Sequence, residues 1–347
     1  MAVETGSQPP PTETTEKGPA TSRALASGAW TLVKRFLTLR EGSVIVITVL
    51  TILYFSITLD QFATSGNFKT LLPYFAPVAI LAAGEVFLMI NGEIDLSIGA
   101  VYLFAPFIFY EFNNGGIPLI ASLILAILAC MVIGLINGLF TAVVGINSFI
   151  TTLGMLLILN GAVFLWTGGA PRGALSDNFR SIGRQGIEGI PWIEQLPWAV
   201  LLLIAVGVLA VLLMRSDFGR QLIATGDNDR TAHLSGVRVN RVRILAFVLS
   251  GTMAVLAGIM LGGFGGVSAQ VGKGLEFDAI TACVLGGVVL GGGRGSVVAA
   301  MAGALTLEAL FTWLNLQGIS GALEDTIQGV IIIAAVSFAG YRLRGAR

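Results

Sequence analysis

Ten long apolar runs dominate the chain and restrict what it can fold into. In order, they cover residues 44–59, 71–90, 96–112, 117–143, 149–167, 198–214, 244–264, 278–290, 297–316 and 327–341. A helix needs about 20 apolar residues to cross the hydrocarbon layer of a bilayer. Charged residues make up only 12% of the chain, whereas soluble domains carry about 25%. These observations predict an all-α integral membrane protein and exclude an ordinary soluble domain.

Several runs are too short for a straight crossing, and 278–290 is the shortest. Short runs broken by glycine are typical of helices interrupted inside a membrane bundle. We therefore expect about ten transmembrane helices, some of them broken or short. Basic residues favour the cytoplasmic side of a membrane. Ten crossings that start inside place the basic loop 215–243 and the C-terminal arginines in the cytoplasm, so both termini are predicted to be cytoplasmic.

The first 40 residues differ from the rest of the chain. Residues 1–27 are rich in Pro, Thr, Ser and Glu, a composition that predicts a disordered N-terminal tail. In 28–40, Trp30, Val33 and Phe36 recur at helical spacing beside Lys34 and Arg35. This pattern predicts an interfacial helix on the membrane surface. Residues 41–347 then form the membrane domain.

Six polar residues within or between the apolar runs are candidates for a translocation pathway. They are Glu85, Asn91, Glu93, Asp95, Ser97 and Glu308. A carboxylate inside a membrane is costly and is usually functional. The segment 91–99 predicts either a broken helix beside a substrate path or an ordinary turn, with Asp95 capping a helix that begins at Leu96. Glu85 and Glu308 fit a pathway, a proton site or a hydrogen bond to a neighbouring helix.

The loop 215–243 is the most charged segment and lies between two apolar runs. Asp217 can cap a helix that ends at Gly226, and Asp227 can cap a second helix that Gly236 ends in the left-handed conformation. Two capped helices favour a docking surface over a solvated loop that only sets the topology. The predicted docking residues are Arg220, Gly226, Asp227, Asn228, Arg230, Leu234, Ser235, Gly236 and Val237.

The sequence offers little support for catalysis or for metal binding. The glycine-rich stretch 286–296 lacks the Gly-Lys-Ser/Thr ending of a phosphate-binding loop, so close helix packing explains it better. His233 is the only histidine and lies in the charged loop, which argues against a catalytic triad or a metal site. Cys130 and Cys283 lie in apolar runs and predict no disulfide. Basic and acidic residues number 20 each and indicate no nucleic-acid partner.

Four stretches, in this order, resemble the permease subunits of bacterial ATP-binding cassette (ABC) importers for simple sugars, the ribose, xylose and arabinose branch. Residues 92–99 read Gly-Glu-Ile-Asp-Leu-Ser-Ile-Gly, where the family usually has a second glycine in place of Glu93. Residues 147–154 are similar to the family's Pro-Phe-Ile-x-Thr-Leu-Gly. Residues 218–237 look like its cytoplasmic loop, and 292–297 match its Gly-Gly-Arg-Gly-Ser.

The resemblance implies a multi-pass permease of the bacterial cytoplasmic (inner) membrane that pairs with a second permease chain, identical or different. It implies a separate cytoplasmic ATPase that binds ATP and magnesium, so that this chain carries no cofactor and is not an enzyme. A periplasmic or lipid-anchored binding protein would deliver the sugar. By resemblance, Gly226, Asn228, Ser235 and Gly236 mark the loop that couples to the ATPase.

We therefore expect a permease that moves a neutral monosaccharide, a pentose or related sugar, by alternating access. A second hypothesis is a proton-coupled secondary sugar transporter that uses Glu85, Glu93 or Glu308. A third is a membrane scaffold or receptor that transports nothing, which the broken helices and intramembrane carboxylates disfavour. ATP-driven uptake separates the first hypothesis from the second.

Overall fold

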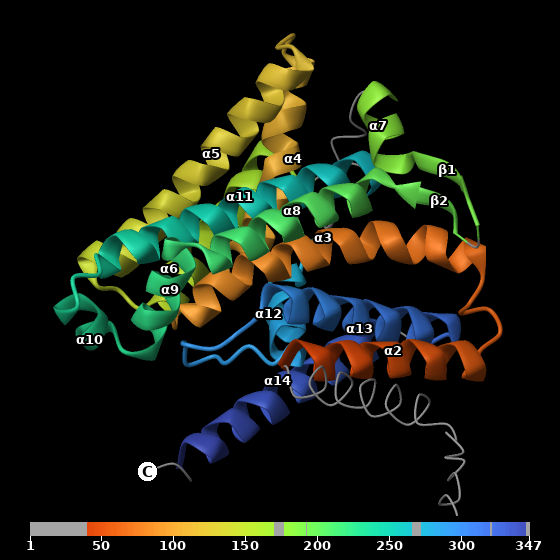
Figure 1. Ribbon diagram of the computed structural model, residues 1–347. Helices are drawn as coiled ribbons and strands as arrows, with labels where there is room; N and C mark the ends of the chain where they lie inside the picture. Colours follow the sequence, from red (N-terminus) through yellow and green to blue (C-terminus); the bar gives the residue numbers. More distant parts are fainter. Residues whose placement is uncertain (1–39, 170–176, 192, 266–271, 320, 345–347) are drawn as a thin grey trace, which may run out of the picture.

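The computed structural model describes residues 40–169, 177–191, 193–265, 272–319 and 321–344. The predicted disordered tail, 1–27, lies outside these described residues, and so does the predicted interfacial helix, 28–40, apart from its last residue. Within the described ranges the chain is a helical bundle with one short β-hairpin (Figure 1). The prediction of an all-α protein is therefore confirmed, with the hairpin as the exception.

The helices differ widely in length. In order, the elements are α2 (Arg40–Thr58), α3 (Ser65–Ile90), α4 (Ile98–Asn114), α5 (Leu119–Leu139), the π-helical turn η1 (Phe140–Val144), α6 (Ser148–Thr167), α7 (Asp177–Arg184), β1 (Gly186–Ile190), β2 (Glu194–Pro197), α8 (Trp198–Arg215), α9 (Asp217–Asp227), α10 (Asp229–Leu234), α11 (Val239–Gly265), α12 (Leu275–Leu285), α13 (Val297–Leu316) and α14 (Gly321–Arg344).

Seven helical segments of the described residues are long and apolar enough to cross a membrane. They are Glu41–Thr58, Ser65–Ile90, Leu119–Val144, Ser148–Thr167, Trp198–Arg215, Val239–Phe264 and Val297–Leu316. The three other predicted apolar runs fold as α4, α12 and α14. At 1.5 Å per residue, the 11 residues of α12 span only about 17 Å, roughly half of a 30 Å hydrocarbon layer. The predicted count of about ten crossings and the cytoplasmic position of both termini stay predictions.

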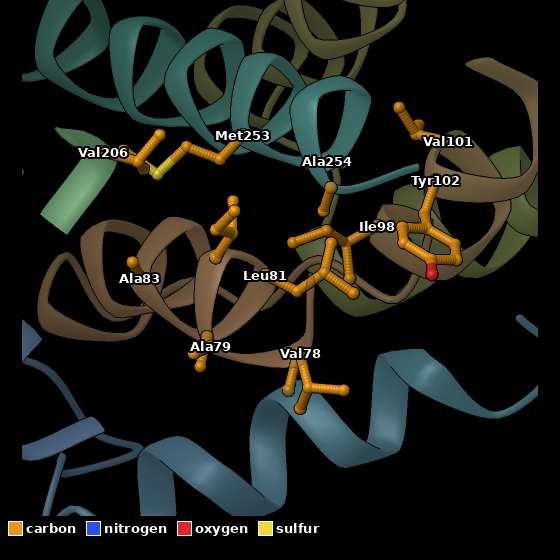
Figure 2. Packing of buried hydrophobic residues seen from close by; sticks show 14 of the residues in the cluster. Val78, Ala79, Leu81, Ala83, Ile98, Val101, Tyr102, Val206, Met253 and Ala254 are labelled. Atoms are coloured by element: carbon orange, nitrogen blue, oxygen red, sulfur yellow. The ribbon is translucent and has the colours of Figure 1, made fainter. Parts of the chain in front are cut away.

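Helix α3 is the centre of the bundle. In its most apolar 18-residue stretch 89% of the residues are buried, against 17% for α2. Figure 2 shows Leu81 of α3 near Ala254 of α11 and Val206 of α8 near Met253 of α11, whereas Val78 lies on the other side of α3. A helix that is apolar on every side is expected inside a bundle, and α3 fulfils that expectation.

Glycines bring α5 and α11 close together. A Cβ atom at Gly134 would collide with the carbonyl oxygen of Phe247, and one at Gly138 would collide with the backbone of Ile244. The small-xxx-small spacing of Gly134 and Gly138 therefore serves helix packing, as the sequence predicts.

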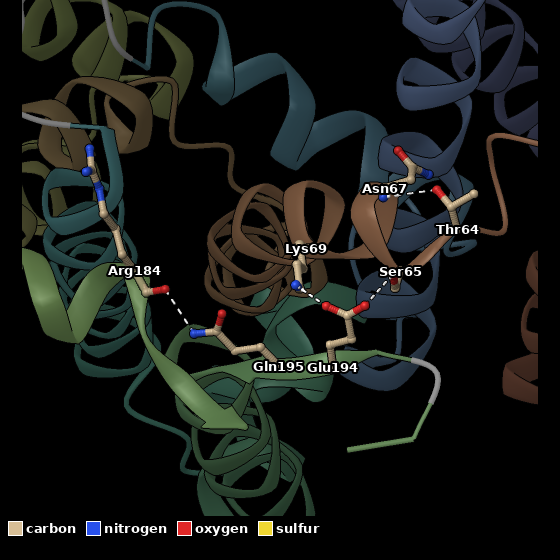
Figure 3. Close-up of polar contacts among 7 residues, drawn as sticks. All are labelled: Thr64, Ser65, Asn67, Lys69, Arg184, Glu194 and Gln195. Carbon is tan, nitrogen blue, oxygen red and sulfur yellow. Dashed lines mark hydrogen bonds and ion pairs between the residues drawn. The ribbon is translucent and has the colours of Figure 1, made fainter. Parts of the chain in front are cut away.

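The hairpin of β1 and β2 caps the end of the bundle where α3 begins. The strands are antiparallel, with Gly186 opposite Pro197. Glu194 forms an ion pair with Lys69 and accepts a hydrogen bond from Ser65 Oγ at 2.9 Å (Figure 3). Gln195 Nε2 donates to the carbonyl oxygen of Arg184 at 3.1 Å. The hairpin is thus held to α3 by polar contacts.

Candidate functional site

The charged loop contains the two predicted helices, but their boundaries differ from the prediction. Helix α9 begins at Asp217, and its N-cap residue is Ser216. Asp217 is therefore not the cap; it is the first helical residue and pairs with Arg220 one turn later. An acidic residue in the first turn is stabilised by the helix dipole, so Asp217 still favours the start of α9.

The second helix is capped one residue later than predicted. Helix α9 continues through Gly226 to Asp227, and Asn228 Oδ1 accepts a hydrogen bond from the Thr231 N–H at 2.9 Å. The predicted cap Asp227 was wrong because the helix had not yet ended there. Asn is as good an N-cap as Asp, so sequence preference alone does not separate these neighbours.

The predicted left-handed end of the second helix is confirmed. Gly236 has a φ of 87°, and the Val237 N–H donates to the carbonyl oxygen of Ala232 at 3.0 Å. This six-to-one bond after a left-handed residue is the Schellman ending. It directs the chain from α10 back into α11.

The end of α9 rests directly on the backbone of two other segments. A Cβ atom at Gly226 would collide with the Ile90 carbonyl oxygen, at the end of α3, and with the Gly293 nitrogen. The Gly293 N–H itself donates to that Ile90 oxygen at 2.7 Å. We call Gly226, Ile90 and Gly293 the glycine seat. It joins the charged loop to α3 and to the glycine-rich stretch.

Arg243 joins the same loop to the segment between α3 and α4. Its Nε lies 3.0 Å from Glu93 Oε1, and its second guanidinium nitrogen lies 3.5 Å from Asp229 Oδ2. The Nε contact is an ion pair, since the N–H is not aligned for a hydrogen bond. The Glu93 side chain is only 12% exposed, so water weakens this pair less than it weakens a surface pair. Glu93 thus contacts the loop, and Arg243 is a residue that the prediction missed.

The segment between α3 and α4 is buried and held by side chains. Asp95 Oδ1 accepts hydrogen bonds from the Ser97 N–H at 2.8 Å and from Ser97 Oγ at 2.5 Å. Asn137 Nδ2 of α5 donates to Ser97 Oγ at 2.8 Å. Helix α4 starts at Ile98, not at Leu96. Asp95 therefore orders the turn before the helix instead of capping a helix that starts at Leu96.

Three successive backbone N–H groups of this turn find side-chain acceptors on other helices. The Asp95 N–H donates to Glu85 Oε1 at 3.1 Å. The Leu96 N–H donates to Thr152 Oγ1 at 3.0 Å, and the Ile94 N–H donates to Ser148 Oγ at 3.3 Å. An irregular backbone inside a membrane is tolerated only when its polar groups are satisfied in this way. We call Glu85, Ser97, Asn137, Ser148 and Thr152, together with Asp95, the break network.

The prediction missed Asn137, Ser148 and Thr152. Ser148 and Thr152 are four residues apart at the start of an apolar run, so they share one helix face. That spacing was the available signal. It cannot name the segment that the face contacts.

Part of the buried polar chemistry has no partner within the described residues. Glu85 Oε2, Asn137 Oδ1 and both side-chain polar atoms of Asn91 are buried without a hydrogen bond. Each such group costs about 1–3 kcal/mol. Of these residues, Glu85 and Asn91 are pathway candidates that the sequence marked, whereas Asn137 is not.

The other predicted docking residues divide into two groups. Arg220, Arg230 and Ser235 are exposed, and Leu234 is 81% exposed although it is apolar. Val237 is half-buried and packs against the core. A single exposed apolar side chain is common on protein surfaces, so Leu234 by itself does not mark a contact surface. The exposed side chains lie on or directly after α9 and α10, and α9 also contributes Gly226 to the glycine seat.

Glu308 lies apart from all the other candidates. It is on α13, in a cavity that also touches the first turns of α3. The last residue of α3, Ile90, is part of the glycine seat, so this cavity lies at the opposite end of α3. In the part of the chain that the structure describes, no three His, Cys, Asp or Glu side chains gather to hold a metal ion.

Comparison with known proteins gives a family match and several named relatives. A family model described as "Branched-chain amino acid transport system / permease component" matches residues 67–336. Two proteins named "Autoinducer 2 import system permease protein LsrC", from Escherichia coli (strain K12 / DH10B) and Shigella flexneri, are each 35% identical over 266 residues, which is 76% of either chain. The protein of that name from Yersinia pseudotuberculosis (serotype O:3) is 36% identical over 76% of this chain and 74% of its own length. No solved structure matches the chain.

The family match includes the break network and the charged loop, and the relatives extend it to a named import system. Together with the membrane-spanning helices, these findings show that the chain belongs to the permease-component family of ABC importers, multi-pass proteins of the inner membrane.

Proposed function

We propose that this chain is the membrane subunit through which a small neutral monosaccharide, a pentose or related sugar, enters the cytoplasm by alternating access. A separate cytoplasmic ATPase binds ATP and magnesium and docks on α9 and α10. A periplasmic or lipid-anchored binding protein delivers the solute. A second permease chain and the surrounding lipid complete the assembly.

The observation that carries this proposal is the double connection of the charged loop. The glycine seat joins it to α3 by backbone contact, and Arg243 joins it to Glu93 by an ion pair. A push on the exposed faces of α9 and α10 is therefore transmitted to the end of α3 at Ile90 and to Glu93, three residues further along, in the segment that interrupts the bundle. Packed contacts and ion pairs of this kind carry energetic coupling between distant sites.

The chemistry of the break network supports a neutral substrate. Its side chains are carboxylates, amides and hydroxyls, which exchange hydrogen bonds with hydroxyl groups readily. A substrate carboxylate would meet the acidic side chains of Glu85 and Asp95 and no basic side chain of the network. The family description names branched-chain amino acids and the relatives import autoinducer 2, so uptake assays should test all three kinds of solute.

Proton coupling is the second candidate function. It would use Glu85, Glu93 or Glu308. Glu93 already forms an ion pair with Arg243, and Glu308 lies away from the network. The relatives are components of an import system of the ABC class, which favours ATP as the energy source.

Reconstitution tests the proposal directly. The chain is placed in proteoliposomes with candidate ATPases and binding proteins, and uptake of D-ribose, autoinducer 2 and L-leucine is measured with and without ATP. We expect ATP-dependent uptake of the sugar or of autoinducer 2. Uptake by the chain alone under a pH gradient would overturn the proposal in favour of the secondary transporter.

A variant of Gly236 tests the coupling role of the loop. Gly236→Val places a β-branched residue at a φ of 87°, where L residues are strained. We expect ATP hydrolysis to continue while uptake falls and membrane insertion stays normal. Gly161→Ala is the control, since nothing lies near its Cβ position. If Gly236→Val supports the same uptake as Gly161→Ala, Gly236 has no role in coupling.

A further inference from the structure

A cavity of about 370 Å³ lies between the first turns of α3 and the last turns of α13. Six hydrogen-bonding side chains line it: Asn67, Thr70, Tyr74, Glu308, Thr312 and Asn315. Two leucines complete the wall. The volume is in the range of sites for small molecules, about 300–1,000 Å³.

The polar lining follows the helical repeat on both helices. On α3 the polar residues are three and four positions apart, at 67, 70 and 74; on α13 they are four and three apart, at 308, 312 and 315. Such spacing places residues on one face of a helix. Two polar faces therefore meet across the cavity within otherwise apolar membrane helices.

The cavity reaches well into the bundle. Glu308 precedes the end of α13 at Leu316 by eight residues, and Tyr74 follows the start of α3 at Ser65 by nine. At 1.5 Å per residue these positions are roughly 12–14 Å from the helix ends. That depth is a large part of one leaflet of a 30 Å hydrocarbon layer, so solvation at the membrane surface does not explain Glu308 and Tyr74. The other four polar residues lie within five residues of a helix end.

Most of this hydrogen-bonding capacity is unused. Asn67 and Thr70 are satisfied locally, by the carbonyl oxygens of Phe62 at 2.8 Å and of Asn67 at 2.8 Å. Within the described residues, the polar groups of Tyr74, Glu308, Thr312 and Asn315 form no hydrogen bond. One carboxylate, one amide and two hydroxyls therefore face the cavity without partners.

Another polar residue of α13 shows the contrast. Thr306 faces α2, where its Oγ1 lies 2.8 Å from Thr48 Oγ1 and donates to the Ala302 carbonyl oxygen at 3.0 Å. The Thr306 hydroxyl is thus satisfied by its packing partners, whereas the polar groups on the cavity face of the same helix have no hydrogen-bond partner within the described residues.

We propose that this cavity between α3 and α13 is a binding site for a neutral, hydroxyl-rich solute, with Glu308 as the principal acceptor. A carboxylate accepts from two hydroxyls, an amide both donates and accepts, and the Tyr74 ring offers an apolar face. A metal ion is disfavoured because Glu308 is the only carboxylate among these lining residues. The cavity is at the end of α3 away from the glycine seat, so it faces the outside if α9 and α10 dock an ATPase. Identification of the ligand as the imported solute rests on the proposed function.

Thiol labelling tests the site without any partner protein. Thr312→Cys and the control Thr306→Cys are each prepared in lipid nanodiscs and treated with a charged, membrane-impermeant methanethiosulfonate. The two native cysteines are buried and should stay unlabelled. We expect Thr312→Cys to react at least tenfold faster than Thr306→Cys. Equal rates would show that water does not enter the cavity and would overturn the proposal.

Protection experiments then test the ligand chemistry. D-ribose, D-xylose and D-galactose serve as hydroxyl-rich probes, and L-leucine serves as the comparison. We expect at least one sugar to slow the labelling of Thr312→Cys in a saturable way. We also expect the added change Glu308→Gln to raise the half-maximal sugar concentration about tenfold or more. Protection by L-leucine alone, by no probe, or equally with and without Glu308→Gln would overturn the proposal.

The outcomes separate this site from the proposed function. If sugars protect Thr312→Cys but uptake does not depend on ATP, the proposed binding site is supported and the proposed ATP-driven function is contradicted. If uptake depends on ATP, Glu308→Gln does not change its KM and no sugar protects Thr312→Cys, the proposed permease function is supported and the proposed binding site is contradicted.

Discussion

The glycine seat gives the sharpest test of how the charged loop is attached. Gly226 is the last residue but one of α9. Its missing side chain lets the Ile90 carbonyl oxygen and the Gly293 nitrogen approach the Cα atom. Gly226→Ala adds one methyl group there. Both obstacles are backbone atoms, so no rotation of a side chain can relieve the collision.

The magnitude follows from two parts. Forcing a methyl group into closely packed structure costs about 1–3 kcal/mol. The displaced backbone also loses the 2.7 Å hydrogen bond from Gly293 to Ile90, which contributes about 1 kcal/mol. We therefore expect Gly226→Ala to weaken the docking of α9 by about 2–4 kcal/mol. That free energy raises the undocked population roughly 30- to 900-fold.

Limited proteolysis measures that population. Arg230 is exposed on α10, and trypsin cleaves it faster when the loop detaches and unfolds locally. When opening and closing are fast, the cleavage rate follows the equilibrium population of the open form. Gly161→Ala in α6 is the matched control because its Cβ position is empty. Its helix should gain about 1 kcal/mol, with cleavage at Arg230 unchanged.

A Gly226→Ala protein that is cleaved at Arg230 at the wild-type rate and unfolds at the wild-type temperature would contradict this expectation. That result would mean that the backbone shifts at no cost and that the seat is not a rigid joint. Faster cleavage in both Gly226→Ala and Gly161→Ala would instead indicate a general loss of helix stability.

Three further predictions concern single contacts. A double-mutant cycle of Arg243→Gln and Glu93→Gln, followed by thermal unfolding, should give a coupling free energy of about 1 kcal/mol or more; additive effects would contradict the ion pair. Thr152→Val removes the acceptor of the Leu96 N–H and should cost about 1–3 kcal/mol, whereas Thr151→Val removes an unpaired hydroxyl and should be neutral or stabilising. The hydrogen bond from Lys69 lowers the pKa of Glu194 below its usual value of 4.5. The paired carboxylate therefore stabilises the folded state above pH 4.5, and this stabilisation is lost as the pH falls through the lowered pKa. The difference in Tm between wild type and Glu194→Gln should shrink on acidification.

Features that depend on local sequence could be predicted well. The apolar runs became helices because each one carries its own hydrophobic signal. Gly236 was recognised as a left-handed helix end because few other residues adopt a positive φ at low cost. The small residues of α5 were assigned to helix packing, which their spacing specifies within a single segment.

Features that depend on distant partners could not be predicted. Thr152 and Leu96 are 56 positions apart, and nothing in either segment names the other. Arg243 looked like one arginine among six in the loop, although its ion pair with Glu93 distinguishes it. The caps moved by one residue at Ser216 and Asn228 because Ser, Asp and Asn compete closely at N-cap positions.

The two attachments of the loop differ in how they can respond to a partner. The glycine seat is a contact between backbone atoms, so no side-chain rotation can loosen it. As long as this contact persists, the end of α3 must move together with α9. The Arg243 contact is an ion pair between a long flexible side chain and two carboxylates, Glu93 and Asp229. An arginine can exchange one carboxylate for the other by rotating its side chain, at a cost far below that of moving a helix. A push on α10 that strengthens the Arg243–Asp229 pair would therefore break the Arg243–Glu93 pair first. The segment before α4 would then be free to move while α3 keeps its contact with Gly226. On this reasoning Glu93→Gln should loosen that segment in hydrogen exchange without changing cleavage at Arg230, whereas Gly226→Ala should change both.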